Sequence, residues 1–368
     1  GMNGRDAAAL ALNAGSSSLK FGVYRSRDSD AGPQTVVEGT LRVQGDESFI
    51  DYRDATATAP RQHKIDAPVP HAFEAIFRLP ETRPLGTPAV IGHRIVHGGP
   101  GLRRHATIDT AVRQGIEAAA AIAPLHVPPA LAYLDHARQV FPLALQVACF
   151  DTAFHHPLPD LARVLPLPVE LRQRGIERYG FHGLSCESIL HQLGEPPPRL
   201  VIAHLGSGAS VTAVSRGRSI DTSMGFTPAG GLPMASRSGD LDPGIALYLL
   251  RRGEAGVDVL EAWLEHRAGL LGVSGSSGDL RVLQRSDDPL AKLAIAQFAQ
   301  AVAKQVAGMI VALGGLDLLV FTGGIGEHAT NVGEDIWRRL APCRGEASYR
   351  RMRSRENERI AHHALRLW

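Results

Sequence analysis

The chain has 368 residues, 44% of them hydrophobic and 21% charged, which excludes a disordered or fibrous protein and allows two domains. Its 39 basic and 37 acidic side chains leave a formal charge of +2, so we expect small-molecule ligands and no nucleic-acid or membrane partner. The three cysteines lack CxxC spacing, which disfavours a disulfide framework or a zinc site and favours the reducing cytoplasm. No apolar stretch approaches the roughly 20 residues that cross a bilayer, and the start has no signal-peptide pattern.

The first predicted elements are a strand, a turn and a second strand. Residues 7–12 and 19–24 are apolar, and the segment from Asn13 to Ser18 has the composition of a turn. The same arrangement recurs over residues 200–214, where Gly206 to Gly208 separates two apolar runs. This repetition predicts two similar halves.

The region between the two copies contains helices and loops. Helical periodicity covers residues 110–123, and a new turn-rich region begins near Asp151, where we place the boundary between the halves. Residues 59–70 and 195–198 are predicted loops, because proline removes a backbone donor and restricts the residue before it.

The second half continues with a long helix, a strand and a glycine turn. Asp288 and Pro289 form a helix start, and apolar residues then recur at helical spacing as far as Leu313. Residues 316–321 form a compact strand, and Gly323 to Gly326 turns the chain toward another helix. Alternating strands and helices predict an α/β fold.

Three glycine- or serine-rich turns follow predicted strands, at residues 13–18, 206–208 and 323–326. Each can direct backbone N–H groups at a phosphate because glycine permits close approach. One such turn alone is more typical of a plain hairpin, but three in one chain favour phosphate binding. The chain has no Walker motif and no glycine fingerprint in a strand-to-helix context, which disfavours a P-loop or a Rossmann site.

Histidine, arginine and aspartate residues gather in five short apolar or glycine-rich segments. For any one histidine, a structural role is the more common one. The segments are residues 93–99, 124–126, 150–155, 179–183 and 237–240. Taken in chain order, with Leu12-Asn13-Ala14-Gly15-Ser16-Ser17-Ser18 and with residues 221–228, 269–275, 279–281 and 321–327, they closely resemble the acetate kinase family. That family belongs to a wider group that includes sugar kinases, actin and the Hsp70 ATPase.

The resemblance runs from the N-terminus to about Asp335 and implies an α/β fold with two duplicated ribonuclease-H-like domains of the actin-like ATPase type, which close a cleft on ATP. The implied domains are residues 1–150, joined by residues 357–368, and residues 151–356. By the same resemblance the protein is a homodimer.

The implied reaction is Mg²⁺- or Mn²⁺-dependent transfer of the ATP γ-phosphate to a short carboxylate such as acetate, giving an acyl phosphate and ADP. A carboxylate is ionised at neutral pH, so the nucleophile needs no general base. The reaction needs relief of charge repulsion and stabilisation of the transferring phosphoryl oxygens. The resemblance gives catalytic and transition-state roles to Arg94, His126, Asp151, His182 and Arg237, and metal binding to Asn13, Asp151 and Glu356.

The remaining implied contacts concern the nucleotide and the acyl group. Phosphate, metal and nucleoside contacts fall on Asn13, Ser16, Ser18, Lys20, His204, Gly206, Ser207, Gly208, Asp279, Arg281, Gly324 and Gly326. Arg94 holds the carboxylate, and a small apolar pocket is formed by Val96, Leu125, Phe181 and Pro228. One methylene changes apolar binding by only about 1–3 kcal/mol, so these residues do not separate acetate from propionate.

The chain departs from the family pattern at several positions. Ser207 and Val127 replace asparagines, and Cys186 replaces a histidine. Residues 350–359 are arginine-rich where the family has an apolar strand before its acidic metal motif, and such a charge run is more typical of a solvated face. Glu356 fits the acidic position because of its interval to the following Ile-Ala pair, with Glu358 as the alternative.

Two further functions stay open at this point. One is a propionate or butyrate kinase, or a kinase that uses pyrophosphate as donor. The other, suggested by the altered C-terminal segment, is a catalytically weak nucleotide-binding protein of the actin and Hsp70 type. Retention of Arg94, Asp151, His182 and Arg237 argues against the second.

Overall fold

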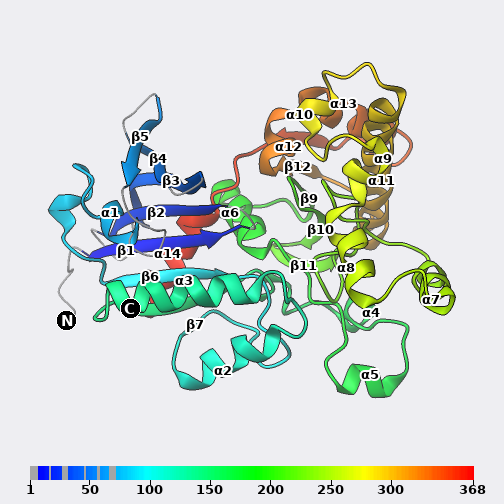
Figure 1. Cartoon of the computed structure of the whole chain (residues 1–368). Coiled ribbons are helices and arrows are strands. Elements are labelled where there is room, and N and C mark those ends of the chain that lie inside the picture. Colours follow the sequence, from blue (N-terminus) through cyan, green and yellow to red (C-terminus); the bar gives the residue numbers. More distant parts are fainter. Residues whose placement is uncertain (1–6, 16–17, 27–31, 45–46, 56–58, 66–71) are drawn as a thin grey trace. The chain divides into compact units, whose positions relative to one another are not determined.

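The computed structural model describes residues 7–15, 18–26, 32–44, 47–55, 59–65 and 72–368 (Figure 1). The chain forms two compact units, the first made of Gly1–Ala153 and Arg355–Trp368 and the second of Phe154–Ser354. These limits lie a few residues from the predicted ones at 150/151 and 356/357, and they place both Asp151 and Glu356 in the first unit.

The first unit is built on a mixed sheet, eight-stranded within the described residues, with the order β5-β4-β3-β2-β1-β6-β8-β7. Strands β1, β6 and β8 are parallel neighbours, and the other pairs are antiparallel. The predicted loop at 59–70 was wrong in part, because five of its residues pair with β4 as β5. The strands are Ala7–Ala14 (β1), Leu19–Ser26 (β2), Gln34–Gln44 (β3), Glu47–Asp54 (β4), Arg61–Ile65 (β5), Val90–Ile95 (β6), Ala106–Thr107 (β7) and Leu145–Phe150 (β8).

Helices α3 and α14 pack against this sheet (Figure 1). Successive strand residues face opposite sides, so Ile91 joins the core with Ala137 of α3, whereas Gly92 faces α14. A Cβ at Gly92 would lie 2.6 Å from Ile360, so the helix can approach this closely only over glycine. The helices are Ala72–Ile76 (α1), Thr110–Ala119 (α2), Val127–Val140 (α3) and Glu356–Leu367 (α14), with a 3₁₀ turn at Arg83–Leu85 (η2), and α2 ends four residues before its predicted limit at 123.

The second unit repeats the central topology of the first. Its sheet, five-stranded within the described residues, has the order β11-β10-β9-β12-β13, with β9, β12 and β13 parallel. This order matches β3-β2-β1-β6-β8 of the first unit, which confirms the predicted duplication. The strands are Arg199–Leu205 (β9), Ala209–Ser215 (β10), Arg218–Thr222 (β11), Leu318–Thr322 (β12) and Ser348–Arg351 (β13).

The arginine-rich segment near the C-terminus keeps a strand despite its charge. Arg350 and Arg351 lie in β13 and pair with β12, and the Arg351 guanidinium donates to Thr330 Oγ1 at 3.0 Å and to its carbonyl at 3.1 Å. Charge alone predicts a solvated face here and misses the strand. The backbone hydrogen bonds that form a strand do not depend on the polarity of the side chains.

The helices of the second unit include one long central helix, α11. Its predicted start and end are confirmed, since Asp288 Oδ1 accepts from the Leu290 amide at 2.8 Å and Gly314 ends the helix in the left-handed conformation. By length and composition α11 could cross a membrane, which corrects the expectation that no stretch approaches that length, but it packs against β9, β10 and α9. The helices are Asp160–Arg163 (α4), Val169–Gln173 (α5), Gly183–Leu193 (α6), Pro243–Arg252 (α7), Val257–His266 (α8), Gly269–Ser274 (α9), Leu280–Leu283 (α10), Pro289–Leu313 (α11), Gly323–His328 (α12) and Thr330–Arg339 (α13), with a 3₁₀ turn at Ala153–His155 (η3).

Candidate active site

Three neighbouring parallel strands of the first unit bring three predicted site residues together. Asn13 lies near the end of β1, Arg94 near the end of β6, and Asp151 follows β8. The Arg94 Nε donates to Asp151 Oδ1 and Oδ2 at 3.1 and 3.0 Å, and its Nη1 donates to Asn13 Oδ1 at 3.1 Å. The carboxyl ends of adjacent parallel strands are the usual place for ligands in α/β sheets.

The first residue of α14 completes this cluster. Asn13 Nδ2 donates to Glu356 Oε2 at 2.9 Å, so one amide side chain contacts both Arg94 and Glu356. Glu358 instead lies 3.7 Å from the Arg355 guanidinium. The structure thus brings Glu356 to the cluster, as the sequence favoured.

The cluster holds two carboxylates for one guanidinium. Asp151 is only 1% exposed, and this burial raises the pKa of its carboxyl, as does Glu356, while Arg94 acts in the opposite direction. Burial alone lowers the pKa of Arg94, but Asp151 and Glu356 more than offset it, so the pKa lies above its ordinary value. Two carboxylates and an amide oxygen are hard ligands of the kind that Mg²⁺ or Mn²⁺ prefers, and the donors present fit such an ion.

A small cavity of about 20 Å³ adjoins Arg94. Three of the predicted residues, Val96, Leu125 and His126, line it. Ala14, Gly15, Pro129 and Ala130, which the sequence did not single out, also line it. A guanidinium with mainly apolar walls suits a short organic anion.

The other residues predicted at the first glycine turn are only partly described. The Gly15 amide donates to the Ser18 carbonyl at 2.9 Å, which closes the turn. Lys20 is exposed on β2 and lies directly across the strand pair from Asn13. Ser16 lies outside the described residues.

In the second unit, His182 and Arg237 lie beside the glycine turn between β9 and β10. A Cβ built on Gly208 would lie 3.3 Å from His182 Nε2 and 3.5 Å from Arg237 Nη1, so both side chains lie at this glycine's open face. The Arg237 Nη1 donates to the Pro228 carbonyl at 3.2 Å, and its Nε lies 3.4 Å from Glu265 Oε2. Burial raises the pKa of Glu265, with Arg237 acting against that rise.

Two histidines of the second unit form a stacked pair. The rings of His182 and His204 lie 4.1 Å apart between centroids, at an interplanar angle of 25°. Ser210 Oγ bonds His182 Nδ1 at 2.9 Å, and Ser185 Oγ bonds His204 Nδ1 at 2.8 Å. Both Nδ1 atoms are thereby engaged by serines, and His182 is held in the left-handed conformation at the start of α6. Sequence reasoning missed Ser185, Ser210 and Glu265, because serine and glutamate at such positions carry no spacing signal.

The two glycine turns of the second unit lie close together. The Gly206 amide donates to the Gly208 carbonyl at 2.9 Å, and the Ser207 carbonyl accepts from Ala235 at 3.2 Å. A Cβ on Gly206 would lie 3.9 Å from the amide nitrogen of Gly324. Residues 323–326, predicted as a turn leading to a helix, are the first turn of α12 itself, in which Gly326 is buried.

The remaining predicted residues have structural contacts of their own. Asp279 caps α10, and the Arg281 guanidinium donates to its carboxylate, which lowers the pKa of Asp279. Phe181 is buried, and its carbonyl bonds His155 Nε2 at 2.8 Å. Phe181 and Pro228 belong to the second unit, whereas Val96 and Leu125 belong to the first.

Two buried histidines of the sequence clusters are structural. His93 Nε2 bonds Gln146 Oε1 at 2.7 Å, and burial lowers the pKa of His93 to about 4. His155 bonds Ser219 Oγ and the Phe181 carbonyl, and burial lowers its pKa to about 4 as well. Both are neutral near pH 7, consistent with the common structural role of histidine.

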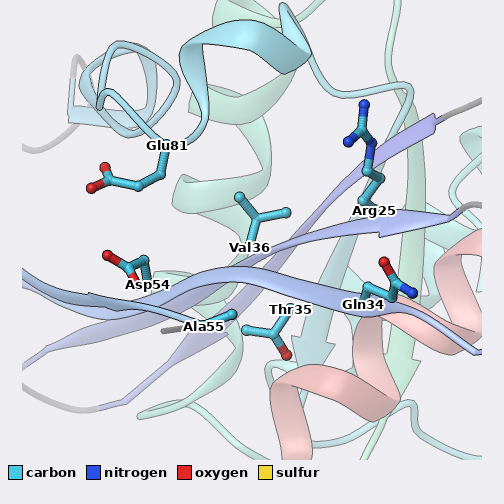
Figure 2. Close-up of a pocket in the computed structure, with 7 residues that line it drawn as sticks. All are labelled: Arg25, Gln34, Thr35, Val36, Asp54, Ala55 and Glu81. Carbon is cyan, nitrogen blue, oxygen red and sulfur yellow. The ribbon is translucent and has the colours of Figure 1, made fainter. Parts of the chain in front are cut away.

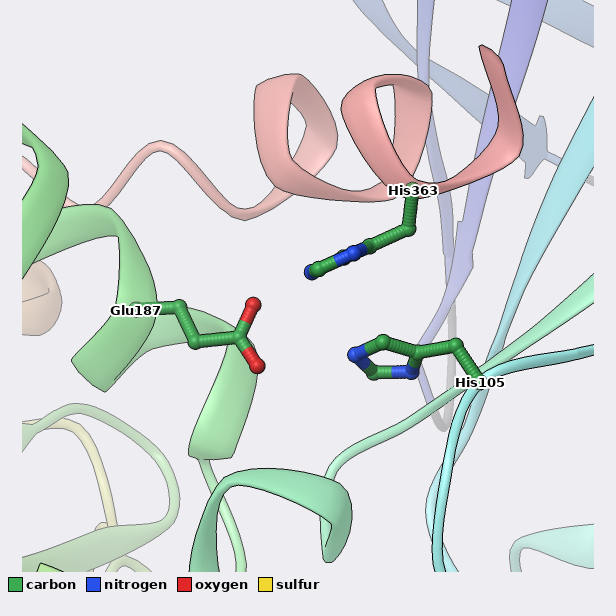
Figure 3. A group of neighbouring side chains, drawn as sticks. All are labelled: His105, Glu187 and His363. Atoms are coloured by element: carbon green, nitrogen blue, oxygen red, sulfur yellow. The ribbon is translucent and has the colours of Figure 1, made fainter. Parts of the chain in front are cut away.

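A second histidine pair lies in the first unit. The rings of His105 and His363 lie 3.9 Å apart (Figure 3), and the Phe150 amide donates to His105 Nδ1 at 3.0 Å. Glu187, also drawn, belongs to the second unit. The pair links α14 to the end of β8, directly before Asp151.

A larger cavity of about 330 Å³ lies elsewhere in the first unit. Figure 2 shows carboxylates of Asp54 and Glu81 on one side and Arg25 on the other. Arg61 forms ion pairs with both carboxylates. The lining contains none of the predicted site residues, and its charges are of both signs, so we do not assign the activity to it.

The chain is similar to known proteins over nearly its whole length. The model of the acetokinase family matches residues 8–357. An acetate kinase of Rhodopseudomonas palustris is 41% identical over 88% of this chain and 83% of its own, and one of Methylocella silvestris is 38% identical over 89% and 85%.

Solved structures give the same result. A propionate kinase from Francisella tularensis superposes with a TM-score of 0.88 at 34% identity, covering 98% of this chain and 100% of its own. Porphyromonas gingivalis acetate kinase superposes with a TM-score of 0.82 at 28% identity, covering 98% and 99%. The duplicated fold is therefore that of the actin-like ATPases, and the chain belongs to the acetokinase family.

Proposed function

We propose that this chain is an acetate kinase, which transfers the γ-phosphate of ATP reversibly to acetate and forms acetyl phosphate and ADP. The observation that carries the proposal is the small cavity beside Arg94, which pairs one guanidinium with apolar walls. This combination suits an anion that consists of one carboxylate and a short alkyl group. Relatives named acetate kinase at 38% to 41% identity support the assignment.

Arg94 orients the acid in this mechanism. Its guanidinium binds the carboxylate, and one carboxylate oxygen attacks the γ-phosphorus while the bond from phosphorus to the β,γ-bridging oxygen breaks. The electron pair leaves with ADP, and no proton is transferred, because the nucleophile is already ionised at neutral pH.

His182 and Arg237 stabilise the charge on the transferring group. Both lie on the open face of Gly208, where a backbone without a side chain allows close approach by phosphate. In the tautomer in which Ser210 Oγ donates to His182 Nδ1, the Nε2–H group of His182 would donate to the transferring group. Arginine acting on a transferring phosphoryl group contributes about 10³–10⁵ in rate. His126, which lines the Arg94 cavity, is a secondary donor.

A divalent metal and ATP follow from the family, and we propose Mg²⁺, with Mn²⁺ as a substitute. Asn13, Asp151 and Glu356 would hold the ion through oxygen atoms. When bound, it would neutralise phosphate charge. Arg94 donates hydrogen bonds to two of these residues, Asp151 and Asn13.

We place the nucleotide on the second unit. Gly206, Ser207, Gly208 and His204 would face the phosphates, with Gly324 and Gly326 close by. Asp279 and Arg281 would approach the nucleoside. The side chain of Ser207 has no amide group, unlike the asparagine usual in the family. We therefore expect nucleotide binding to be weaker by about one neutral hydrogen bond, 0.5–1.5 kcal/mol.

A propionate kinase is the second candidate, because the Francisella propionate kinase superposes with a TM-score of 0.88. The test is acyl phosphate trapped as hydroxamate, with C2 to C4 acids and with ATP, GTP or pyrophosphate as donor. We expect the highest kcat/KM for acetate with ATP. Higher kcat/KM for propionate would favour the second candidate, and ATP binding without product from any acid would favour a weak nucleotide-binding protein.

We further propose a cytoplasmic homodimer. None of the ten residues of α7 is buried within the chain, although five of them are large and apolar, and four of these five are exposed. Contiguous exposed apolar surface is typical of a face covered by another molecule. The four are Ile245, Leu247, Tyr248 and Leu250. Light scattering should give twice the chain mass, and Tyr248→Glu should give a monomer; a monomeric unaltered chain would contradict this.

A further inference from the structure

The first turn of α3 forms one wall of the Arg94 cavity and has no free backbone donor. A helix start normally leaves four unpaired amides, which favour anions. Here Pro128 and Pro129 have no N–H group, and the amides of His126 and Val127 both donate to the Ala123 carbonyl, at 3.1 and 3.0 Å. The backbone of this turn therefore offers no phosphate site, and Pro129 and Ala130 give it an apolar surface beside His126.

This wall fixes the direction in which an acid binds. Arg94 supplies the cation for the carboxylate. The alkyl end would then lie against the apolar lining residues, namely Ala14, Val96, Leu125, Pro129 and Ala130. Of these, Val96 and Leu125 carry large side chains, whereas Ala14 and Ala130 each carry one methyl group, and Ala130 is the one that lies on α3, the helix forming this wall.

We propose that Ala130 limits the acid to two carbons, an inference that rests on the proposed function and names its substrate size. Ala130 is 6% exposed and packs in the core cluster with Val127, Leu134 and Phe150. The helix cannot move away from a longer acid without disrupting that core, because protein interiors are close-packed. The methyl of Ala130 therefore acts as a fixed stop.

Changing this one side chain should change the acid preference. Ala130→Gly removes one methyl, about the space that one added methylene needs. A methylene in an apolar pocket changes kcat/KM by about 10–200-fold, so the propionate to acetate ratio should rise at least tenfold. Ala130→Val adds two methyl groups and should lower kcat/KM for acetate at least tenfold.

Ala132 offers a matched control. It lies on the same helix but is exposed, so Ala132→Gly has the same loss of helix propensity without touching the cavity. Ala132→Val matches Ala130→Val in the same way. The acid ratio of both controls should equal that of the unaltered chain.

The readouts are hydroxamate kinetics with acetate and propionate, and the dissociation constants of both acids measured by ¹³C NMR titration. A propionate to acetate ratio within threefold of the unaltered chain for Ala130→Gly, or an equal shift in Ala132→Gly, would overturn the inference. If the unaltered chain made no acyl phosphate, the proposed function would fail on its own, and the NMR constants would still decide whether Ala130 selects acid size. Circular dichroism identifies any unfolded variant, and Ala130→Val then tests the same limit from the opposite side.

Discussion

Replacing Arg94 with alanine should leave the buried carboxylate of Asp151 without its cationic partner. Arg94 makes hydrogen bonds to both Asp151 oxygens and one to Asn13, and Asp151 is 1% exposed. Removing one partner of a buried ion pair costs about 3–5 kcal/mol, because the other charge stays behind without compensation. We expect Arg94→Ala to lower the free energy of unfolding by about that amount near pH 8.

The same variant should respond to pH in a defined direction. Burial and Glu356 raise the pKa of Asp151, and in Arg94→Ala no guanidinium opposes them. A carboxyl whose pKa is higher in the folded than in the unfolded state binds its proton more tightly when folded. Stability therefore increases as pH falls through the folded-state pKa. The deficit of Arg94→Ala should be smaller near pH 5 than near pH 8.

Urea denaturation followed by circular dichroism measures both effects. The control is Arg94→Ala combined with Asp151→Asn, which removes the buried charge and should recover part of the lost stability and show no such pH response. If Arg94→Ala were as stable as the unaltered chain near pH 8, the ion pair between Arg94 and Asp151 would not be what stabilises the ends of these strands. Turnover of acetate should fall by about 10³–10⁵ in Arg94→Ala, and a loss under tenfold would refute its catalytic role.

Three further changes test the metal and phosphate contacts. Glu356→Gln should weaken Mn²⁺ binding in the presence of ADP by about 10–100-fold, measured by electron paramagnetic resonance, whereas Glu358→Gln should change it little; equal losses would contradict the metal assignment. Gly208→Ala places a methyl 3.5 Å from Arg237 Nη1, so kcat should fall by about 10²-fold with an unchanged melting temperature, and full activity would exclude close approach of phosphate there. Glu265→Gln should lower kcat but not acetate affinity, because Glu265 orients Arg237; a change confined to KM for acetate would argue against that role.

Sequence patterns predicted the first strands and the long helix because apolar runs and capping residues can be read from a short stretch of sequence. The Asn13 strand and α11 follow from apolar runs and from an Asp-Pro start, and both are confirmed. The strand at Arg61–Ile65 was missed, since its residues are mostly exposed and polar and it depends on pairing with β4. Side chains that contact a predicted site residue, such as Glu265 beside Arg237, could not be found either, because the two partners are distant in sequence.

The two halves share their strand order but differ in the residues they carry at the corresponding hairpins. In the first unit Asn13, one residue before the end of β1, contacts Arg94 and Glu356 through its amide side chain. In the second unit the equivalent hairpin between β9 and β10 carries Gly208, which offers bare backbone to His182 and Arg237. In the proposed function, the Asn13 side chain helps to hold the carboxylate cluster, and the lack of a side chain at Gly208 leaves room for a phosphate. A strand order set by backbone pairing satisfies both, so the sheets remain alike while these turns do not.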